Sequence, residues 1–369
     1  MKPLAGIRVI DFSTLLPGPL ATLMLSDAGA EVIKVEKIGG EDMRKSIPKV
    51  NGESFLFAVL NRGKKSIEID LKNKDGYRRI KKLIKSCDVI VEQFRPGVMK
   101  RLGLNWSAVK KINKKVVYCS ISGYGQSGKK RLKAGHDLNY MAESGLLCLS
   151  TSKDGTPTIP STQVADIAGG TYPAFMNILL GIIKASKSGK GSYIDISMFE
   201  NLIPLAWLGL GRYLYSGNSP EKNTLHLNGG TARYNIYRTK DKKYLALGAL
   251  EDKFWQNFCE IIGAPAKVKN EEFNSNILIN KIQNIIKKKN SIYWKKKLEK
   301  QYNICCTPIG NISEFFNDAH IRKKKIFENI IEIGKKNYPL IPTAVSKDLS
   351  GIKKKSKAPK LGQHNYLIK

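Results

Sequence analysis

Two side chains in this 369-residue sequence stand out as candidates for acid–base chemistry. His136 is one of only four histidines, and it lies in the sequence Ala-Gly-His-Asp, which has the composition of a loop. Imidazole changes its charge near neutral pH, so histidine is well suited to accept and return a proton. Asp166 precedes a glycine-rich stretch, where it could act as an acid or base or simply cap the following helix. Residue types alone leave catalytic and structural roles open for both, and Asp137 could bind the His136 ring or the backbone.

The motifs of several common enzyme classes are absent. The N-terminal loop contains the sequence STLLPGPL where a dinucleotide-binding protein has GxGxxG, and no GxxxxGK[ST] motif occurs. The sequence also has neither a GxSxG elbow nor an HExxH zinc motif. Its six cysteines lack CxxC spacing, which favours reduced thiols and no metal centre.

The net charge of +32 raises the question of a nucleic-acid or membrane partner. The lysines, however, are spread along the chain and mixed with apolar residues, and no nucleic-acid-binding motif accompanies them. No apolar run reaches the ~18 residues of a membrane span. Asp11 and the sequence Pro17-Gly18-Pro19 interrupt the N-terminal apolar stretch, which therefore does not resemble a signal peptide. We expect a cytoplasmic enzyme with a solvated lysine-rich surface, no specific nucleic-acid partner and no membrane partner.

The elements that must position His136 and Asp166 alternate between strand and helix signals, which predicts a parallel sheet covered on both faces. The Asp166 helix is rich in small residues and must pack closely against its neighbours. The predicted strands span residues 7–11, 31–35, 66–71, 88–92 and 116–121; the predicted helices span residues 19–28, 75–85 and 166–184; and residues 123–128 form a glycine-rich loop.

The pattern changes after residue 199. A hairpin is predicted over residues 234–247, and helical segments follow to about residue 300. We therefore expect a large α/β domain formed by residues 1–200 and 321–369, a linker at 201–225 and a smaller α+β domain at 226–320.

Several stretches, in order along nearly the whole chain, carry a family resemblance. They are PLAGIRVIDFSTLLPGPLATLMLSDAGAEVIKVE, NRGKKSIEIDL, EQFRPGVMKRLGL, SGYGQSG, AGHDLNYMAESG, VADIAGG, GKGSYIDISMFE, YLALGALEDKFW and APKLGQH. These stretches resemble the family III CoA-transferase superfamily, and within it the alpha-methylacyl-CoA racemases. The resemblance implies a Rossmann-like parallel-sheet large domain, a smaller domain, and an interlocked homodimer with active sites at the subunit contact.

The resemblance also implies roles for three residues. In transferases of the superfamily the aspartate that matches Asp166 is a nucleophile, which forms a covalent mixed anhydride and then a thioester. In racemases it is an acid–base group opposed by the histidine that matches His136, with a supporting glutamate that matches Glu251. All three positions are occupied here, which favours a racemase of 2-methylacyl-CoA over a CoA-transferase.

Racemisation explains these residue types. Inverting a carbon next to a thioester carbonyl removes a proton from one face and returns one to the other through an enolate, so a base is needed on each side. The ordinary pKa values differ, at about 3.9 for Asp and 6.5 for His. Burial of Asp166 would raise its pKa and a helix N-terminus would lower it. Backbone N–H groups at the start of the Asp166 helix are the expected donors to the enolate oxygen.

Coenzyme A is part of the substrate, so no separate cofactor is expected. By position in the family, Arg95 and Lys37 are candidates to contact the phosphates or adenine of CoA, and Arg62 and Lys65 are weaker candidates. Lys37 stands where the family commonly has arginine, so only a point charge is available there. The chain ends five residues after His364, so we expect the closing helix of the family to be short or absent.

Overall fold

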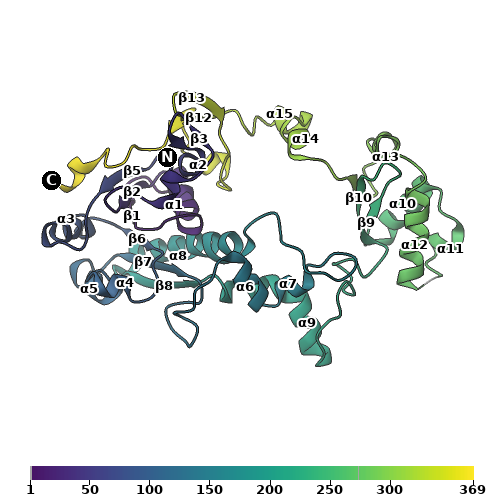
Figure 1. Cartoon of the computed structure of the whole chain (residues 1–369), viewed down its shortest axis with the longest axis horizontal. Helices are drawn as coiled ribbons and strands as arrows, with labels where there is room; N and C mark the ends of the chain where they lie inside the picture. Colours follow the sequence, from purple (N-terminus) through teal and green to yellow (C-terminus); the bar gives the residue numbers. More distant parts are fainter. Residues whose placement is uncertain (1, 273) are drawn as a thin grey trace. The chain divides into compact units, whose positions relative to one another are not determined.

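The computed structural model describes residues 2–272 and 274–369, which form two compact units (Figure 1). Unit 1 comprises the chain up to Ser144, Pro160–Pro204 and Arg322–Lys369, and unit 2 comprises Gly145–Ile159 and Leu205–Ile321. The domains expected from the sequence stay a prediction, because a compact unit is defined by contacts and not by independent folding.

Unit 1 is built on a six-stranded sheet with the strand order β5-β2-β1-β6-β7-β8, in which every neighbouring pair is parallel. The inner strands are buried apart from the first residues of β1 and β2, as expected for a parallel sheet with both faces covered. The α/β prediction is therefore confirmed. The strands are β1 (Arg8–Asp11), β2 (Glu31–Glu36), β5 (Lys65–Glu68), β6 (Val89–Glu92), β7 (Val117–Ser122) and β8 (Ser192–Ser197).

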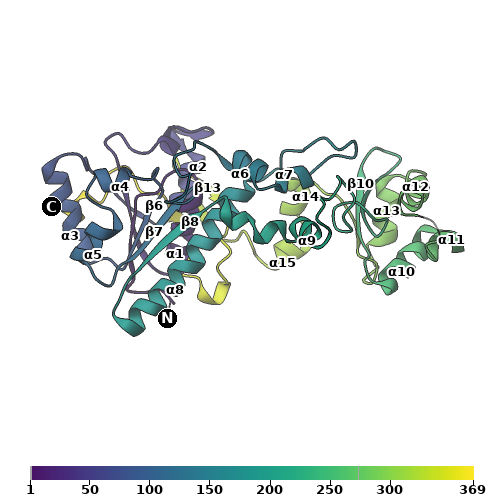
Figure 2. The same ribbon diagram turned by 90° about the horizontal axis from the view of Figure 1, so that it is seen from below.

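Helices cover both faces of this sheet. On one face α1 (Pro17–Asp27) and α8 (Tyr172–Ser188) lie side by side, which Figures 1 and 2 both show. On the other face α3 (Lys74–Lys85) and α5 (Trp106–Ile112) pack on a core of isoleucines from neighbouring strands. Helix α1 begins at Pro17 and not at the predicted Pro19. Either proline can occupy the first turn of a helix, because the N–H that proline lacks would have no acceptor within the helix there.

Unit 1 also contains parts that the sequence analysis did not predict. Besides β8, these include a second small sheet formed by β12 (Ile330–Ile333), β13 (Lys336–Pro339) and β14 (Lys355–Lys357). Its shorter elements are β3 (Lys49–Val50), β4 (Glu53–Ser54), α2 (Phe55–Asn61), α4 (Val98–Arg101) and α6 (Asp137–Glu143), with 3-10 turns at η1 (Asp42–Lys45), η3 (Glu200–Leu202) and η5 (Lys347–Leu349).

The C-terminal segment is attached to strand β5. The Ser66 N–H donates to Nδ1 of His364 (3.1 Å), and the His364 N–H donates to the Ser66 carbonyl (2.9 Å). The Glu68 N–H donates to Oδ1 of Asn365 (2.8 Å). The closing helix is a single 3-10 turn, η6 (Asn365–Ile368). These bonds give the LGQH motif a structural role.

Unit 2 contains an antiparallel sheet of order β11-β10-β9 with helices packed on it. The predicted hairpin is confirmed by β9 (Tyr234–Arg238) and β10 (Tyr244–Gly248), to which β11 (Cys306–Pro308) is added. The helices of unit 2 are α7 (Leu146–Leu149), α9 (Trp207–Ser216), α10 (Asp252–Ile262), α11 (Ala266–Lys269), α12 (Ser275–Ile286), α13 (Ser291–Leu298) and α14 (Ile312–Phe316). Helix α9 lies in the segment expected to be a linker.

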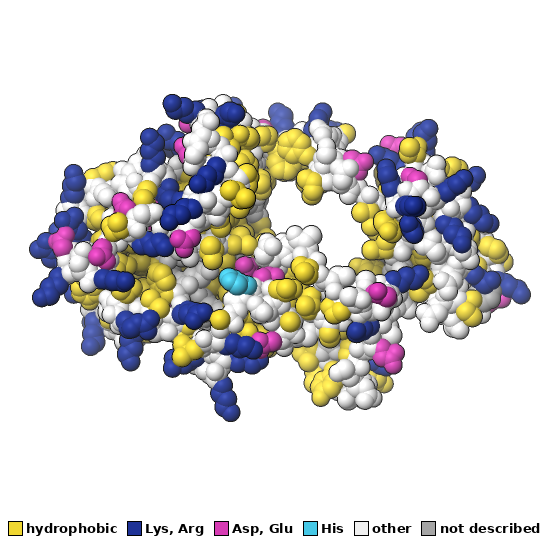
Figure 3. All heavy atoms as spheres, in the orientation of Figure 1, with side chains coloured by type: hydrophobic (Ala, Val, Ile, Leu, Met, Phe, Trp, Pro, Cys, Tyr) yellow, Lys and Arg dark blue, Asp and Glu magenta, His cyan; other side chains and the backbone are white. Residues whose placement is uncertain are grey.

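Lysine and arginine side chains are not concentrated in one patch of the visible surface. Figure 3 shows lysine and arginine side chains scattered over the visible face of each unit, with hydrophobic side chains between them. This distribution agrees with the solvated surface expected from the sequence.

One helical run, Ala165–Ser188, is long and apolar enough by length and composition to cross a membrane, contrary to the sequence expectation. Its inner face packs against β7, β8 and α1, and a single helix of this kind is weak evidence for a membrane span.

Candidate active site

Asp166 lies in a π-helical segment, η2 (Ala165–Thr171), that leads directly into α8. Single π-helical turns inside α-helices are frequently found at functional sites. The two glycines that follow allow this segment to pack tightly. A Cβ atom on Gly169 would lie 2.5 Å from the Met198 carbonyl oxygen, and one on Gly170 would lie 3.1 Å from Cβ of Pro17. The close packing predicted from the small residues is therefore confirmed.

The Asp166 carboxyl group has a raised pKa of about 6. Burial is the main cause, because it disfavours the charged form, and the negative charge of Asp137 adds to it. The charge of His136 acts in the opposite direction. The sequence left open whether burial or the helix terminus would dominate, and burial does.

Asp137 is bonded directly to the backbone of the Asp166 segment. The Asp166 N–H donates to Oδ1 of Asp137 over 3.0 Å, and the Ile167 N–H donates to the carbonyl of Gln163 over 3.0 Å. Both N–H groups are therefore occupied. The expectation that they would bind the enolate oxygen is wrong for these two residues, because a neighbouring carboxylate and a carbonyl already accept from them.

His136 is exposed and immediately precedes α6, the helix that begins with Asp137. Its backbone N–H donates to Oδ1 of Asn139 over 3.0 Å. The buried Tyr140 hydroxyl donates to the carbonyl of Gly135 over 2.6 Å, which holds the residue before the histidine. These contacts fix the loop and leave the imidazole accessible. The hydrogen bond from the Asp166 N–H to Asp137 brings His136, Asp137 and Asp166 into one neighbourhood of unit 1.

Glu143, at the other end of α6, holds the loop that precedes His136. Its carboxylate accepts hydrogen bonds from Lys133 (2.6 Å), Lys130 (2.7 Å) and the Tyr124 hydroxyl (2.8 Å). The sequence analysis missed this residue. Its position seven residues after His136, on the same short helix, was the available signal.

Glu251 belongs to unit 2, where it is exposed and occupies the N-cap position of α10 without a side-chain capping bond. Arg233 holds the residues on both sides of it, by donating to the carbonyl of Leu250 and to the carboxylate of Asp252, each over 2.6 Å. Pairing of Glu251 with His136 of unit 1 stays a prediction.

The four basic residues proposed to bind CoA differ in their surroundings. Arg62 is buried and holds Asp27 through two bonds of 2.6 and 2.7 Å, which suits a structural role better than ligand binding. Lys65 pairs with Glu31. The exposed Lys37 pairs with Asp42 over 3.0 Å, a bond that solvent competes with easily.

Arg95 is exposed in the loop after β6. Burial raises the pKa of the Tyr140 phenol to about 12; the charge of Asp166 raises it further and that of Arg95 opposes it. The charges of Arg95 and Asp166 therefore both affect the pKa of Tyr140, in opposite directions. Arg95 also lines a cavity of about 220 Å³ together with the buried Glu92, whose pKa is raised by burial to about 7.

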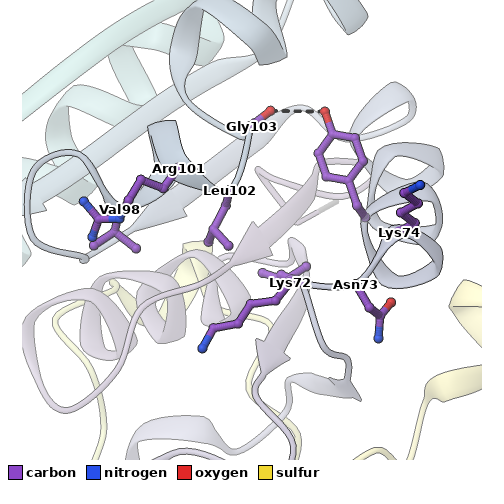
Figure 4. Close-up of a pocket in the computed structure, with 9 residues that line it drawn as sticks. Lys72, Asn73, Lys74, Val98, Arg101, Leu102 and Gly103 are labelled. Carbon is purple, nitrogen blue, oxygen red and sulfur yellow. Dashed lines mark hydrogen bonds between the residues drawn. The ribbon is translucent and has the colours of Figure 1, made fainter.

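A larger cavity of about 680 Å³ lies between the start of α3 and the end of α4 (Figure 4). Lys72 and Lys74 line the cavity on the side of α3, and Arg101 lines it on the side of α4. The Tyr77 hydroxyl connects the two sides by donating a hydrogen bond of 3.3 Å to the Gly103 carbonyl. The sequence analysis did not single out these three basic residues. They occur in LKNKD and MKRLGL, where cations flank apolar positions.

Among the residues that the structure describes, no group of three or more histidine, cysteine, aspartate or glutamate side chains could hold a metal ion. The described cysteines are free thiols.

Comparison with known proteins identifies relatives along nearly the whole chain. The profile of CoA-transferase family III matches residues 4–365. Mouse succinyl-CoA:glutarate CoA-transferase is 37% identical over 286 residues, which cover 77% of this chain and 64% of the mouse protein. Mouse alpha-methylacyl-CoA racemase is 31% identical over 332 residues, which cover 88% of this chain and 82% of that protein. The crystal structure of a CAIB/BAIF family protein from Brucella suis superposes with a TM-score of 0.82 at 27% identity, covering 99% of this chain and 98% of that one.

Proposed function

The chain belongs to CoA-transferase family III, and within this family we propose that it is a racemase that inverts the α-stereocentre of 2-methylacyl-CoA thioesters. One observation carries the proposal. Burial raises the pKa of the Asp166 carboxyl to about 6, and the carboxyl lies within the electrostatic influence of His136. A carboxyl whose pKa lies near neutral pH can both remove and return a proton, which a reversible inversion requires.

In the proposed reaction one of the two groups removes the α-proton. The C–H electron pair moves into the enolate, and the other group, in its protonated form, donates a proton to the opposite face. Asp166 then ends protonated and His136 neutral, or the reverse for the other enantiomer. Asp137 holds the Asp166 backbone, and its negative charge adds to the effect of burial in raising the pKa of the Asp166 carboxyl.

CoA recognition is assigned to the cationic residues of unit 1. The nucleotide end of CoA carries several phosphate charges, and the cavity lined by Lys72, Lys74 and Arg101 supplies three cations beside the ring of Tyr77. Arg95, whose charge lowers the pKa of Tyr140 whereas that of Asp166 raises it, is proposed to bind the diphosphate of CoA, which is nearer the reacting carbon than the phosphate on the ribose. Lys37 and Lys65 are available only if their exposed or half-buried ion pairs are exchanged for phosphate.

A second candidate function is CoA transfer between carboxylic acids, with Asp166 as the nucleophile. It is supported by the mouse relative that is named a succinyl-CoA:glutarate CoA-transferase. Transfer needs a covalent acyl–Asp166 anhydride and does not need His136.

One experiment separates the two. The protein is incubated in D₂O with (R)- and (S)-2-methylacyl-CoA, and both stereochemistry and α-deuterium are followed. A racemase gives inversion with deuterium uptake from either enantiomer. Transfer of CoA to added free carboxylates without α-exchange would replace the racemase assignment with transferase.

We further propose that the protein is a cytoplasmic homodimer. The outward face of α8 carries four exposed apolar side chains at helical spacing, namely Tyr172, Met176, Leu180 and Ile183. Exposed apolar patches of this kind typically mark interaction sites. A second copy of the chain is the occupant that the family resemblance favours.

A further inference from the structure

A cluster of buried charges lies at the carboxyl ends of β1 and β2. It consists of Asp11, Lys34, Glu41 and Lys64, and none of these residues is more than 4% exposed. Burial opposes ionisation of Asp11, but the charges of Lys64 and Lys34 outweigh it and lower the pKa of this carboxyl to about 2. Removing charges from water is costly, and breaking such a pair is typically destabilising. Neither the proposed acid–base chemistry nor CoA binding uses these residues.

Lys64 is the centre of this cluster. Its Nζ donates to Oδ2 of Asp11 (3.2 Å), Oγ1 of Thr22 (2.8 Å) and Oδ1 of Asn61 (2.9 Å). It also donates to the main-chain carbonyl of Pro19 (3.0 Å), in the first turn of α1. Thr22 in turn donates to Oδ2 of Asp11 (2.6 Å), so lysine, threonine and aspartate form a closed set of bonds.

The cluster also holds the start of residues 13–18, which comprise most of the connection from β1 to α1 and the first two residues of α1, and which we call the loop 13–18. The Ser13 N–H donates to Oδ1 of Asp11 over 2.9 Å, and the Ser13 hydroxyl donates to the same oxygen. Lys34 Nζ donates to the Ser13 carbonyl over 2.9 Å. The main chain of the loop is therefore fixed to buried charges at Ser13 and, through Lys64, at Pro19.

The Asp166 segment packs against the same loop. The Thr171 hydroxyl donates to the carbonyl of Pro17 over 2.9 Å, and Gly170 packs against the Pro17 ring so closely that a Cβ atom would lie 3.1 Å from it. The N–H of Gly18 donates to Oε1 of Gln93 over 3.0 Å, which ties the loop to the segment that carries Arg95. A shift of the loop would therefore shift η2 and its carboxylate.

We propose that Lys64, acting through Asp11 and the loop 13–18, is a positioning residue for Asp166. The inference rests on the proposed role of Asp166, although it holds for either an acid–base or a nucleophilic carboxylate. Lys64 does not touch the substrate: its ammonium group is enclosed by protein oxygens.

The test compares Lys64→Met with Arg8→Met. Arg8 lies at the other end of β1, where it pairs with Glu31 over 2.6 Å, so the control also removes one cation that pairs with a carboxylate of unit 1. Hydrogen exchange of backbone amides is measured together with kcat and KM for the α-proton exchange of acyl-CoA. Thr22→Val, which keeps the side-chain shape and removes one hydroxyl, provides a milder variant if Lys64→Met does not fold.

The expected result is faster exchange of the amides at 13–19 and 165–171, unchanged exchange in β7, and a fall in kcat with little change in KM. A misplacement of ~1 Å can cost about 100-fold in rate, so a loss on the order of tenfold or more is expected. The Arg8 variant should retain kcat.

Two outcomes would overturn the proposal. One is a normal kcat in a variant whose loop amides exchange faster. The other is a uniform rise in exchange across unit 1, which indicates a general loss of stability. If the wild-type protein catalyses neither inversion nor transfer, the amides at 165–171 alone decide: faster local exchange supports positioning, and unchanged exchange refutes it.

Discussion

The backbone N–H of Asp166 donates a hydrogen bond of 3.0 Å to the carboxylate of Asp137, the residue directly after His136. This bond ties the loop of one proposed base to the helix of the other. It also places a second negative charge near the Asp166 carboxyl, whose pKa burial has already raised. Asp137 therefore affects both the geometry of the site and its pH dependence.

Asp137→Asn should lower the pKa of Asp166. The amide oxygen can still accept the Asp166 N–H, but the negative charge that disfavours ionisation is gone. For the enantiomer whose proton Asp166 removes, the acid limb of kcat/KM should move from about pH 6 to lower pH, by about half a unit to one unit. A pH–rate profile of each enantiomer measures this, and an acid limb that moves upward would contradict the assigned effect of Asp137.

His136→Ala should abolish inversion in both directions, because one face of the α-carbon loses its only proposed base. Asp166 can still remove and return the proton on its own face, so deuterium exchange of one enantiomer should survive. Chiral analysis and mass spectrometry of acyl-CoA incubated in D₂O follow the two processes separately. Unchanged racemisation in this variant would rule out His136, and Asn139→Ala, which loosens only the loop, serves as a comparison.

The sheet and helices of unit 1 were predictable because their strands are short apolar runs separated by glycine, proline and polar residues. Strand β8 was missed because Ser192–Ser197 alternates polar and apolar residues at the edge of the sheet, which is a weaker signal than a buried run. The sheet of β12, β13 and β14 was missed because its strands are only three or four residues long, and β13 and β14 are polar and contain lysine.

His136 and Asp166 were found from scarce residue types and from the family resemblance. Their shared contact with Asp137 could not be foreseen, because it depends on how α6 packs against η2. For Arg62 the sequence suggested a role that the fold does not favour. A basic residue in a conspicuous motif was a reasonable candidate for phosphate binding, and only the fold reveals that Asp27 already holds its guanidinium group.

Glu92 should make the folded state less stable as the pH rises. Burial raises the pKa of this carboxyl from 4.5 to about 7, so the folded protein binds the proton more tightly than the unfolded chain does. The resulting stability is present below pH 4.5 and is lost as the pH rises toward and through 7. Glu92→Gln removes the ionisation and should raise Tm at about pH 8 relative to wild type, by the equivalent of about 1–3 kcal/mol. Thermal unfolding at several pH values measures this, and a parallel pH dependence in both proteins would contradict it.

Leu180→Glu should convert the proposed dimer to monomers. Leu180 is 63% exposed at the centre of the apolar face of α8, and a buried unpaired carboxylate there would oppose association strongly. Lys111→Glu places a carboxylate on the exposed surface of α5, which covers the other face of the sheet, and should leave the assembly intact. Light scattering after size-exclusion chromatography gives the mass of each variant. A wild-type protein that is monomeric at all concentrations would refute the dimer.

Arg101 and Arg95 should differ in which part of the substrate they recognise. Arg101 lines the larger cavity, which we assign to the nucleotide end of CoA, whereas Arg95 lies near the Tyr140 and Asp166 groups. Arg101→Ala should raise KM for acyl-CoA and leave kcat nearly unchanged, because a remote contact is equal in the ground and transition states. Acyl-pantetheine, which lacks the nucleotide, should show no such difference between Arg101→Ala and wild type.

For Arg95→Ala, we expect KM for acyl-CoA to rise by about ten- to a hundred-fold, which corresponds to the ~1.5–3 kcal/mol of a hydrogen bond to a charged group. Arg95→Lys should recover only part of this loss, because lysine lacks the planar fork that holds phosphate through two bonds. Neutralising Lys353 and Lys354, which lie in a surface run of lysines, should change KM only at low salt, where long-range attraction is unscreened. The phosphate assignment would be wrong if an Arg95 variant had a normal KM and a large fall in kcat, and if kcat fell equally with acyl-pantetheine. The guanidinium would then lie beside the reacting carbon.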